Sequence, residues 1–235
     1  MRNFLRYPLV LGLVTALSGT ALHFTYSGTR DKIEAQQASQ RAAALDKVFW
    51  QGYGATEAVT RNGVDIIKVW RGDLAEGPPN YYAVEGSAVG YNAATPIRLL
   101  VGFANPDNPP PDLRGEPERV VVGWSAIQME ETPGLGQNAA QTAPPYTIAE
   151  LATGRAEEPG PDRRTPFQKQ FADFEQERVY TPAELSLEQD GGPIDGLTGA
   201  TITSGAIIEA IQDADARLDK ALGGSLSREQ DSPSE

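Results

Sequence analysis

The longest apolar run of the sequence lies near its beginning. Residues 7–27 (YPLVLGLVTALSGTALHFTYS) contain no Asp, Glu, Lys or Arg. About 20 helical residues, each rising ~1.5 Å, match a hydrocarbon core of ~30 Å, so this run predicts a single transmembrane helix. Arg2 and Arg6 precede it, and the positive-inside rule then favours a cytoplasmic N-terminus. A cleaved signal peptide is the alternative, because small residues are present at its far end. Both interpretations place the rest of the chain on the periplasmic or extracytoplasmic side.

The middle of the chain has the pattern of a sheet. Residues 31–50 are rich in Ala, Gln and charged residues with a partly helical period, which predicts a helical spacer. Short β-type runs follow at residues 64–70, 80–90, 96–103 and 119–127, separated by Gly and Pro clusters. They predict a mostly antiparallel sheet and, with the helices, an α+β fold.

Two proline-containing stretches interrupt this pattern. Residues 105–118 hold five prolines, which predicts a long hairpin-type loop without a regular element. Residues 137–165 are polar, and the part that reads GRAEEPGPDRRTP predicts an exposed insertion.

The C-terminal third carries two helical patterns. Phe167, Phe171 and Phe174 recur at i, i+4 and i+7, which places three rings on one face of a short helix that packs against the sheet. Apolar residues from Ile207 to Leu222 then follow helical periodicity until two glycines stop it, which predicts a helix over residues 204–222. The polar residues 225–235 predict a disordered tail.

Charge and composition exclude several kinds of function. Thirty-two acidic residues against 20 basic ones give a formal charge of −12, which repels nucleic-acid phosphates. The chain has no cysteine, and its one histidine, His23, lies in the apolar N-terminal run. Thiolate metal sites, iron–sulfur clusters and Ser-His-Asp triads are therefore excluded, and we expect neither a metal site nor a catalytic side chain. Redox work requires a bound cofactor.

The segment before the last helix combines a glycine turn with hydroxyl side chains. It reads DGLTGATITS over residues 195–204. At a helix N-terminus, free backbone N–H groups and the helix dipole favour an anion such as a phosphate. The competing interpretation is a plain helix cap, made by Thr203 or Ser204 without any ligand.

The same segment resembles a flavinylation motif. Asp195, Thr198, Gly199, Ala200 and Thr201 match the pattern Asp, two variable residues, Ser or Thr, Gly, Ala, Thr of the RnfG/NqrC family. These are FMN-carrying subunits of ion-translocating electron-transport complexes. The resemblance implies that Thr201 bears FMN through a phosphoester installed by a flavin transferase, and that the other four residues are recognition context. Thr203 lies outside the motif.

A second segment resembles a loop of the same family. Residues 131–136 read ETPGLG and follow the β-type run at 119–127. Alone, such a string most often forms a Pro-Gly turn. Beside the Thr201 motif, the resemblance implies that it belongs to the FMN pocket, through the residues Glu131, Thr132, Pro133, Gly134, Leu135 and Gly136. Residues 128–130 and 137–138, on either side of this loop, depart from the family pattern. These departures affect the detailed contacts of the loop and not the attachment at Thr201.

The resemblance implies a domain organisation and a role. The chain divides into a membrane anchor (1–30), a helical spacer (31–50), an FMN-binding domain (51–224) and the tail (225–235). It would relay electrons through covalent FMN, with other membrane subunits of an Rnf- or Nqr-type complex as partners, the RnfG branch being favoured. It would sit as a single-pass protein in the inner membrane and would not be catalytic alone, because no Gly-x-Gly-x-x-Gly fingerprint for NADH is present. The alternatives are a flavinylated domain of a reductase outside an ion pump, and a non-catalytic exported binding or scaffold domain.

Overall fold

The computed structural model describes most of the chain. It covers residues 6–73, 75–113, 115, 118–140, 164–174, 176 and 178–223. The predicted tail and most of the polar insertion between residues 137 and 165 lie outside these residues. The chain forms two compact units, Met1–Ala42 and Ala43–Glu235.

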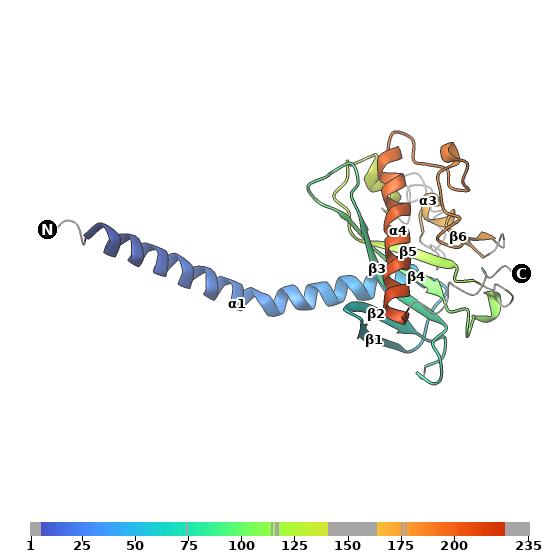
Figure 1. The fold of residues 1–235 in the computed structure, drawn as a ribbon, viewed down its shortest axis with the longest axis horizontal. Helices are drawn as coiled ribbons and strands as arrows, with labels where there is room; N and C mark the ends of the chain where they lie inside the picture. The colour runs from blue at the N-terminus through green and yellow to red at the C-terminus, as the bar shows by residue number, and fades with distance from the viewer. Residues whose placement is uncertain are drawn as a thin grey trace, which may run out of the picture. The chain divides into compact units, whose positions relative to one another are not determined.

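The first unit is helical. Helix α1, Arg6–Val48, runs without a break through the predicted spacer and enters the second unit with its last turns (Figure 1). Threonine hydroxyls at positions 15, 20 and 25 donate hydrogen bonds to carbonyl oxygens one turn earlier at 2.7–3.0 Å, which satisfies them within the helix. The large apolar side chains in the part of this helix that belongs to the first unit, including Leu17 and Phe24, are exposed. A helix long and apolar enough to cross a membrane is not found in the part of the chain that the structure describes.

The second unit is built on an antiparallel sheet, as predicted. Its five strands pair in chain order as a meander: β1 Thr56–Arg61, β2 Val64–Val69, β3 Tyr81–Ala88, β4 Ile97–Ala104 and β5 Val121–Gln128. Strand β1 was not predicted, because it is a polar edge strand with an almost fully exposed pattern. The signal for it was the Asn62–Gly63 pair, whose φ angles of 51° and 74° form the two-residue turn into β2.

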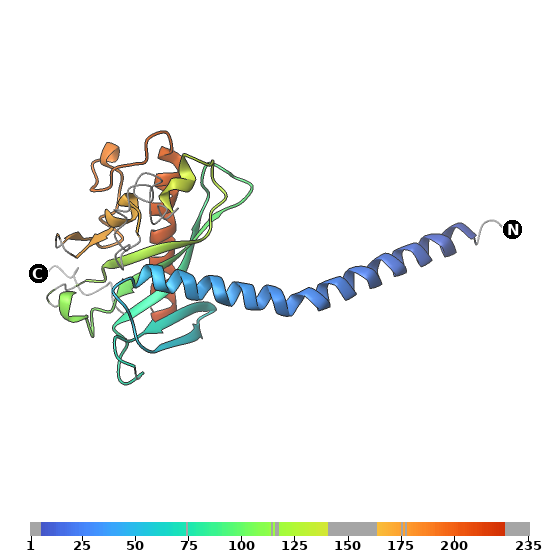
Figure 2. The same cartoon turned by 180° about the vertical axis from the view of Figure 1, so that it is seen from behind.

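Both faces of the sheet are covered. Helix α4, Thr201–Leu222, lies in front of the sheet in Figure 1 and behind it in Figure 2. Gly86 of β3 allows this approach, since a Cβ there would lie 1.9 Å from the carbonyl oxygen of Ala210. The end of α1 covers the other face, where Gly102 and Gly123 leave room for Val48. Successive side chains of β3 to β5 therefore point alternately into two apolar cores, one on each face of the sheet. This explains the nearly continuous hydrophobic sequences of these strands.

The proline-rich connection between β4 and β5 is a hairpin-type loop, as predicted, but it is not wholly irregular. It contains one 3-10 turn, Pro111–Leu113, whose Leu113 is buried in the core on the α1 side. A proline at the first position of a helical turn needs no hydrogen-bond donor, so prolines here do not prevent the turn.

The prediction of three phenylalanines on one helical face is wrong. Helix α3 spans only Pro166–Lys169 and is followed by a small hairpin of β6, Ala172–Asp173, and β7, Arg178–Val179. Phe167 and Phe171 do pack edge-on against Trp124 of β5, with ring centroids 6.2 and 5.7 Å away. Phe174 lies beyond β6 and packs instead toward the core that the end of α1 covers. The periodicity failed because the chain leaves the helix before the third ring.

Candidate functional site

The motif residues form a turn that leads directly into α4. The helix begins at Thr201, three residues before the predicted start, and Ala200 is its N-cap with φ −137° and ψ 39°. Gly199 has φ +74°, a conformation that glycine adopts without strain. The N-cap residue Ala200 makes no side-chain hydrogen bond that caps the helix. The interpretation of Thr203 or Ser204 as a plain N-cap is therefore wrong, because both lie inside the first turn.

The hydroxyl residues of this first turn have different environments. Thr201 is exposed, whereas Thr203 and Ser204 are buried. The first backbone N–H groups of an α-helix have no partner within the helix. Thr201 therefore presents its hydroxyl to solvent beside uncapped N–H groups at the positive end of a 22-residue helix.

Hydrogen bonds hold the turn from both sides. The Leu197 N–H donates to Ser204 Oγ at 2.9 Å, and this hydroxyl donates to the Ala200 carbonyl at 3.0 Å. The Asp195 N–H donates to Gln170 Oε1 at 2.7 Å, and Gln170 Nε2 donates to the Asp195 carbonyl at 3.1 Å. These hydrogen bonds fix the backbone of the motif at its beginning and where the helix starts. The side chains of Asp195, Thr198 and Thr201 are exposed.

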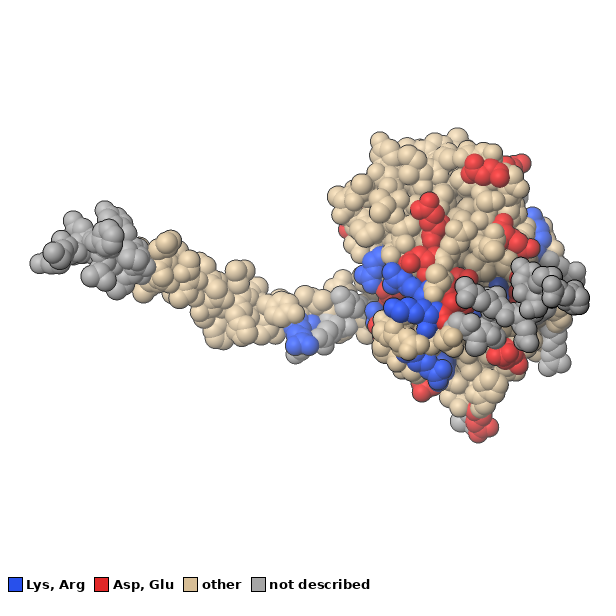
Figure 3. Space-filling model, viewed as in Figure 1, with Lys and Arg blue, Asp and Glu red and all other residues tan. Residues whose placement is uncertain are grey.

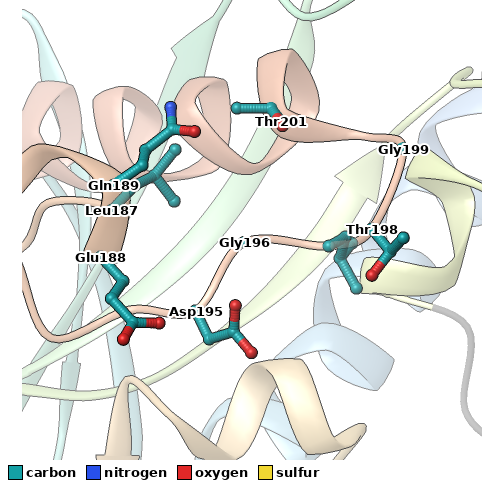
Figure 4. A pocket seen from close by; sticks show the side chains of 9 residues that line it. Leu187, Glu188, Gln189, Asp195, Gly196, Thr198, Gly199 and Thr201 are labelled. Atoms are coloured by element: carbon teal, nitrogen blue, oxygen red, sulfur yellow. The ribbon is translucent and has the colours of Figure 1, made fainter.

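A pocket of about 370 Å³ lies against this turn (Figure 4). That volume is within the ~300–1,000 Å³ range of small-molecule sites. The wall opposite the motif comes from the turn that holds the 3-10 helix η3, Glu188–Asp190. Among the residues that the structure describes, the lining carries the carboxylates of Glu188 and Asp195 and no Lys or Arg; it consists of Leu187, Glu188, Gln189, Asp195, Gly196, Leu197, Thr198, Gly199 and Thr201. Thr201 stands at the helix end of this pocket in Figure 4.

The predicted loop at residues 131–136 meets the same helix end. Thr203 Oγ1 donates to Glu131 Oε2 at 2.7 Å, and both residues are buried, with 2% and 4% of their surface exposed. The backbone approaches closely there, since a Cβ on Gly136 would lie 2.6 Å from Thr203 Oγ1. The structure therefore brings together two segments that are 72 residues apart.

The loop residues divide by exposure. Glu131 and Gly136 are buried, whereas Thr132, Pro133, Gly134 and Leu135 are exposed. Gly134 has φ +79°, and the Leu135 N–H donates to the Thr132 carbonyl at 3.2 Å before the 3-10 turn Gly136–Ala139 begins. None of the six loop residues lines the pocket of Figure 4. Leu135 instead lies beside the turn, 3.3 Å from the position of a Cβ on Gly199.

Thr203 is the residue that the sequence reasoning missed. It was set aside because the motif does not include it, although it supplies the contact between the two predicted segments. The available signal was helical phase: Thr203 lies four residues before Ile207 and eight before Ile211, both buried. Extending the apolar stripe of the helix backwards places its hydroxyl on the core side.

Comparison with protein families identifies a cofactor-binding domain in this part of the chain. Residues 116–215 match the model of the FMN-binding domain, which includes the loop, the turn and most of α4. Residues 1–48 match the RnfG N-terminal region. The predicted resemblance to the RnfG family is confirmed. The chain thus joins the N-terminal region of RnfG to an FMN-binding domain, and FMN is the cofactor of that domain.

Curated proteins that are similar to this chain match it over most of its length. A protein of Methanosarcina acetivorans, named as a subunit of an ion-translocating oxidoreductase complex, is 27% identical over 207 residues, which is 86% of this chain and 87% of that protein. Proteins with the same name from Haemophilus influenzae (28% identical; 86% and 84% of the two chains) and Vibrio cholerae (26%; 88% and 86%) are similar.

Proposed function

We propose that this chain carries FMN through a phosphoester on Thr201 and relays electrons as a subunit of an ion-translocating oxidoreductase complex. The single observation that carries the covalent link is the position of Thr201. Its exposed hydroxyl stands at an uncapped helix N-terminus, beside a pocket and inside the FMN-binding domain. The complex is inferred from the names of the relatives.

The residues around Thr201 fit a phosphate that is attached rather than captured. The uncapped N–H groups of the first turn suit phosphate oxygens. Charge pairing does not suit them, because the described residues that line the pocket carry two carboxylates and no cationic side chain. A site that relied on charge pairing would use Arg or Lys. An ester to Thr201 makes such pairing unnecessary and keeps the cofactor in place.

The protein supplies position and environment for the flavin. When bound, FMN supplies the electron-transfer chemistry that no side chain of a cysteine-free chain offers. Thr201 would hold the phosphate end, and the backbone of the turn, fixed by Ser204 and Gln170, would keep the attachment point rigid. A flavin transferase would recognise the exposed Asp195, Thr198 and Gly199 on the surface of that turn, whereas Ala200, the buried N-cap of α4, would contribute through the backbone shape of the turn.

The membrane location belongs to the same proposal. Residues 7–27 carry no charged side chain, and the exposed apolar residues of α1 in this stretch run from Val10 to Tyr26. The match to the RnfG N-terminal region covers this segment. We infer a single-pass anchor with the second unit on the periplasmic side. Alkaline carbonate should leave the chain in the membrane pellet; release into the supernatant would contradict the anchor.

The covalent link is tested by co-expressing the full chain with a flavin transferase. Denaturing electrophoresis should show flavin fluorescence and an FMN-sized mass increment in the wild type, and neither in Thr201→Ala. Thr201→Ser is the matched control, since it keeps a hydroxyl at the same place. Fluorescence that persists in Thr201→Ala at the wild-type level would refute the assignment to Thr201.

A further inference from the structure

Large hydrophobic side chains are exposed in the second unit at one end only, as far as the described residues go. They are Val89, Tyr91, Leu135 and Ile202, with exposed fractions between 42% and 68%. Scattered exposed hydrophobics are ordinary on protein surfaces, but a group of them at one place indicates an interaction site. Here all four belong to segments that meet at the start of α4.

Three separate segments contribute to this apolar end. Val89 and Tyr91 lie on the connection between β3 and β4, Leu135 on the loop at residues 131–136, and Ile202 in the first turn of α4. The contacts that join them run through Glu131. Its carboxylate accepts from Thr203 on α4 and lies 2.3 Å from the position of a Cβ on Gly90.

Hydrogen bonds within the chain hold the β3–β4 connection against residues 130–131. Asn92 Nδ2 donates to the Glu130 carbonyl at 2.9 Å, and Thr95 Oγ1 donates to Glu130 Oε2 at 3.2 Å. The Asn92 N–H also donates to Glu131 Oε1 at 3.4 Å. A surface fixed in this way loses little conformational entropy on binding, which favours association.

The same end is nearly free of charge. Residues 89–96, 130–136 and 198–205 contain no Lys or Arg, and of their two acidic side chains Glu131 is buried. In Figure 3 the end of the unit where the β3–β4 connection and the start of α4 lie is covered mainly by uncharged side chains, whereas Lys and Arg are seen lower on this face.

We propose that Val89, Tyr91, Leu135 and Ile202 form a docking surface for an uncharged, apolar face of another protein, the redox partner of the flavin on Thr201. This rests on the proposed function, because a flavin on Thr201 exchanges electrons only with a group that comes close to it, and Ile202 is its neighbour in sequence. The chemistry selects a protein over a lipid surface. Anionic lipid headgroups attract Lys and Arg, which residues 89–96, 130–136 and 198–205 lack, whereas depletion of charge and enrichment in aromatic residues mark protein interfaces.

The first experiment identifies the occupant. p-Benzoylphenylalanine placed at position 91 of the full chain, in cells that contain the whole complex, should cross-link on illumination to a subunit that co-purifies with the wild-type chain. The same group at Thr56, on the far edge strand β1, serves as control. Adducts with lipid only, with a second copy of this chain only, or with nothing would each overturn the proposal.

The second experiment separates docking from flavin attachment. Val89→Lys/Tyr91→Lys places two ammonium groups on the docking surface, and Thr56→Lys/Ala58→Lys makes the same charge change at exposed positions of β1. The first variant should keep its in-gel flavin fluorescence but retain about tenfold less of the other subunits on purification, as a loss of ~1.4 kcal/mol gives. The control should keep both. Wild-type retention of the subunits in Val89→Lys/Tyr91→Lys would refute the docking surface, whereas absent fluorescence in the wild type would refute the proposed function.

Discussion

Replacing Thr203 with valine removes one hydroxyl from a buried contact and changes little else in size. In the wild type this hydroxyl donates to Glu131 Oε2 at 2.7 Å, and the two side chains are almost fully buried. A hydrogen bond to a charged group contributes about 1.5–3 kcal/mol, and its loss leaves a buried carboxylate oxygen without its donor. The only other donor to this carboxylate among the described residues is the Asn92 N–H at 3.4 Å. We expect Thr203→Val to lower the free energy of unfolding by about 2 kcal/mol.

The assay is urea unfolding of the full chain made without a flavin transferase. All three tryptophans lie in the second unit, so their fluorescence reports its unfolding. With a slope of ~2 kcal/mol per molar urea, the expected loss lowers the midpoint by about 1 M. Thr201→Val is the matched control, because it makes the same substitution in the same helical turn at an exposed site. Its effect should stay within about 0.5 kcal/mol.

Two results would refute this reasoning. One is a loss in Thr203→Val no larger than that in Thr201→Val, which would mean that the buried hydroxyl contributes nothing. The other concerns Glu131→Gln, which removes the charge from the same contact. Because the two side chains touch, the double variant should deviate from additivity by about 1 kcal/mol. Strict additivity would mean that the two residues do not act through their hydrogen bond.

Two further predictions concern the packing of α4. Gly86→Ala should destabilise the second unit by about 1–3 kcal/mol in the urea assay, because its Cβ would lie 1.9 Å from the Ala210 carbonyl oxygen. Gly72→Ala is the control and should be nearly neutral, because a Cβ there meets open space. Equal destabilisation by the two substitutions would contradict the close approach of α4 to Gly86. Burial raises the pKa of Asp215 above its ordinary value of 3.8, and the attraction of Arg119 opposes this shift. The Asp215 carboxyl therefore stabilises the folded state fully below pH 3.8, and this stabilisation is lost as the pH rises through the pKa of the folded state. The stability of the wild type relative to Asp215→Asn should therefore fall from pH 3 upward; a rise would mean that the attraction of Arg119 exceeds the effect of burial.

The fold was largely predictable from hydrophobic patterning. Strands β2 to β5 and helix α4 have apolar residues at the periods of their structures, and turn residues separate them. Strand β1 was missed because an edge strand exposed on both faces has no such period. Its Asn62–Gly63 turn was the only local signal, and it depends on backbone conformation rather than on hydrophobicity.

The position of Phe174 shows where periodicity stops being informative. Its spacing from Phe167 and Phe171 fits a helix, but four residues of helix are followed by a hairpin. Short patterns of three residues do not determine how far a helix extends, because tertiary packing decides it. The same limit hid the contact between Glu131 and Thr203, since nothing local indicates which of two distant segments will meet.

The different environments of Thr201 and Thr203 follow from helix geometry. Each residue of an α-helix turns the chain by about 100°, so two side chains two positions apart point roughly 200° apart. The apolar stripe through Ile207 and Ile211 fixes which side faces the sheet, and Thr203 lies on that side. Thr201 must then point away from the core, and the attachment of FMN proposed above requires such an accessible hydroxyl. The rotational phase of this one helix thus exposes Thr201, as the proposed attachment requires, and buries Thr203 against the loop at residues 131–136.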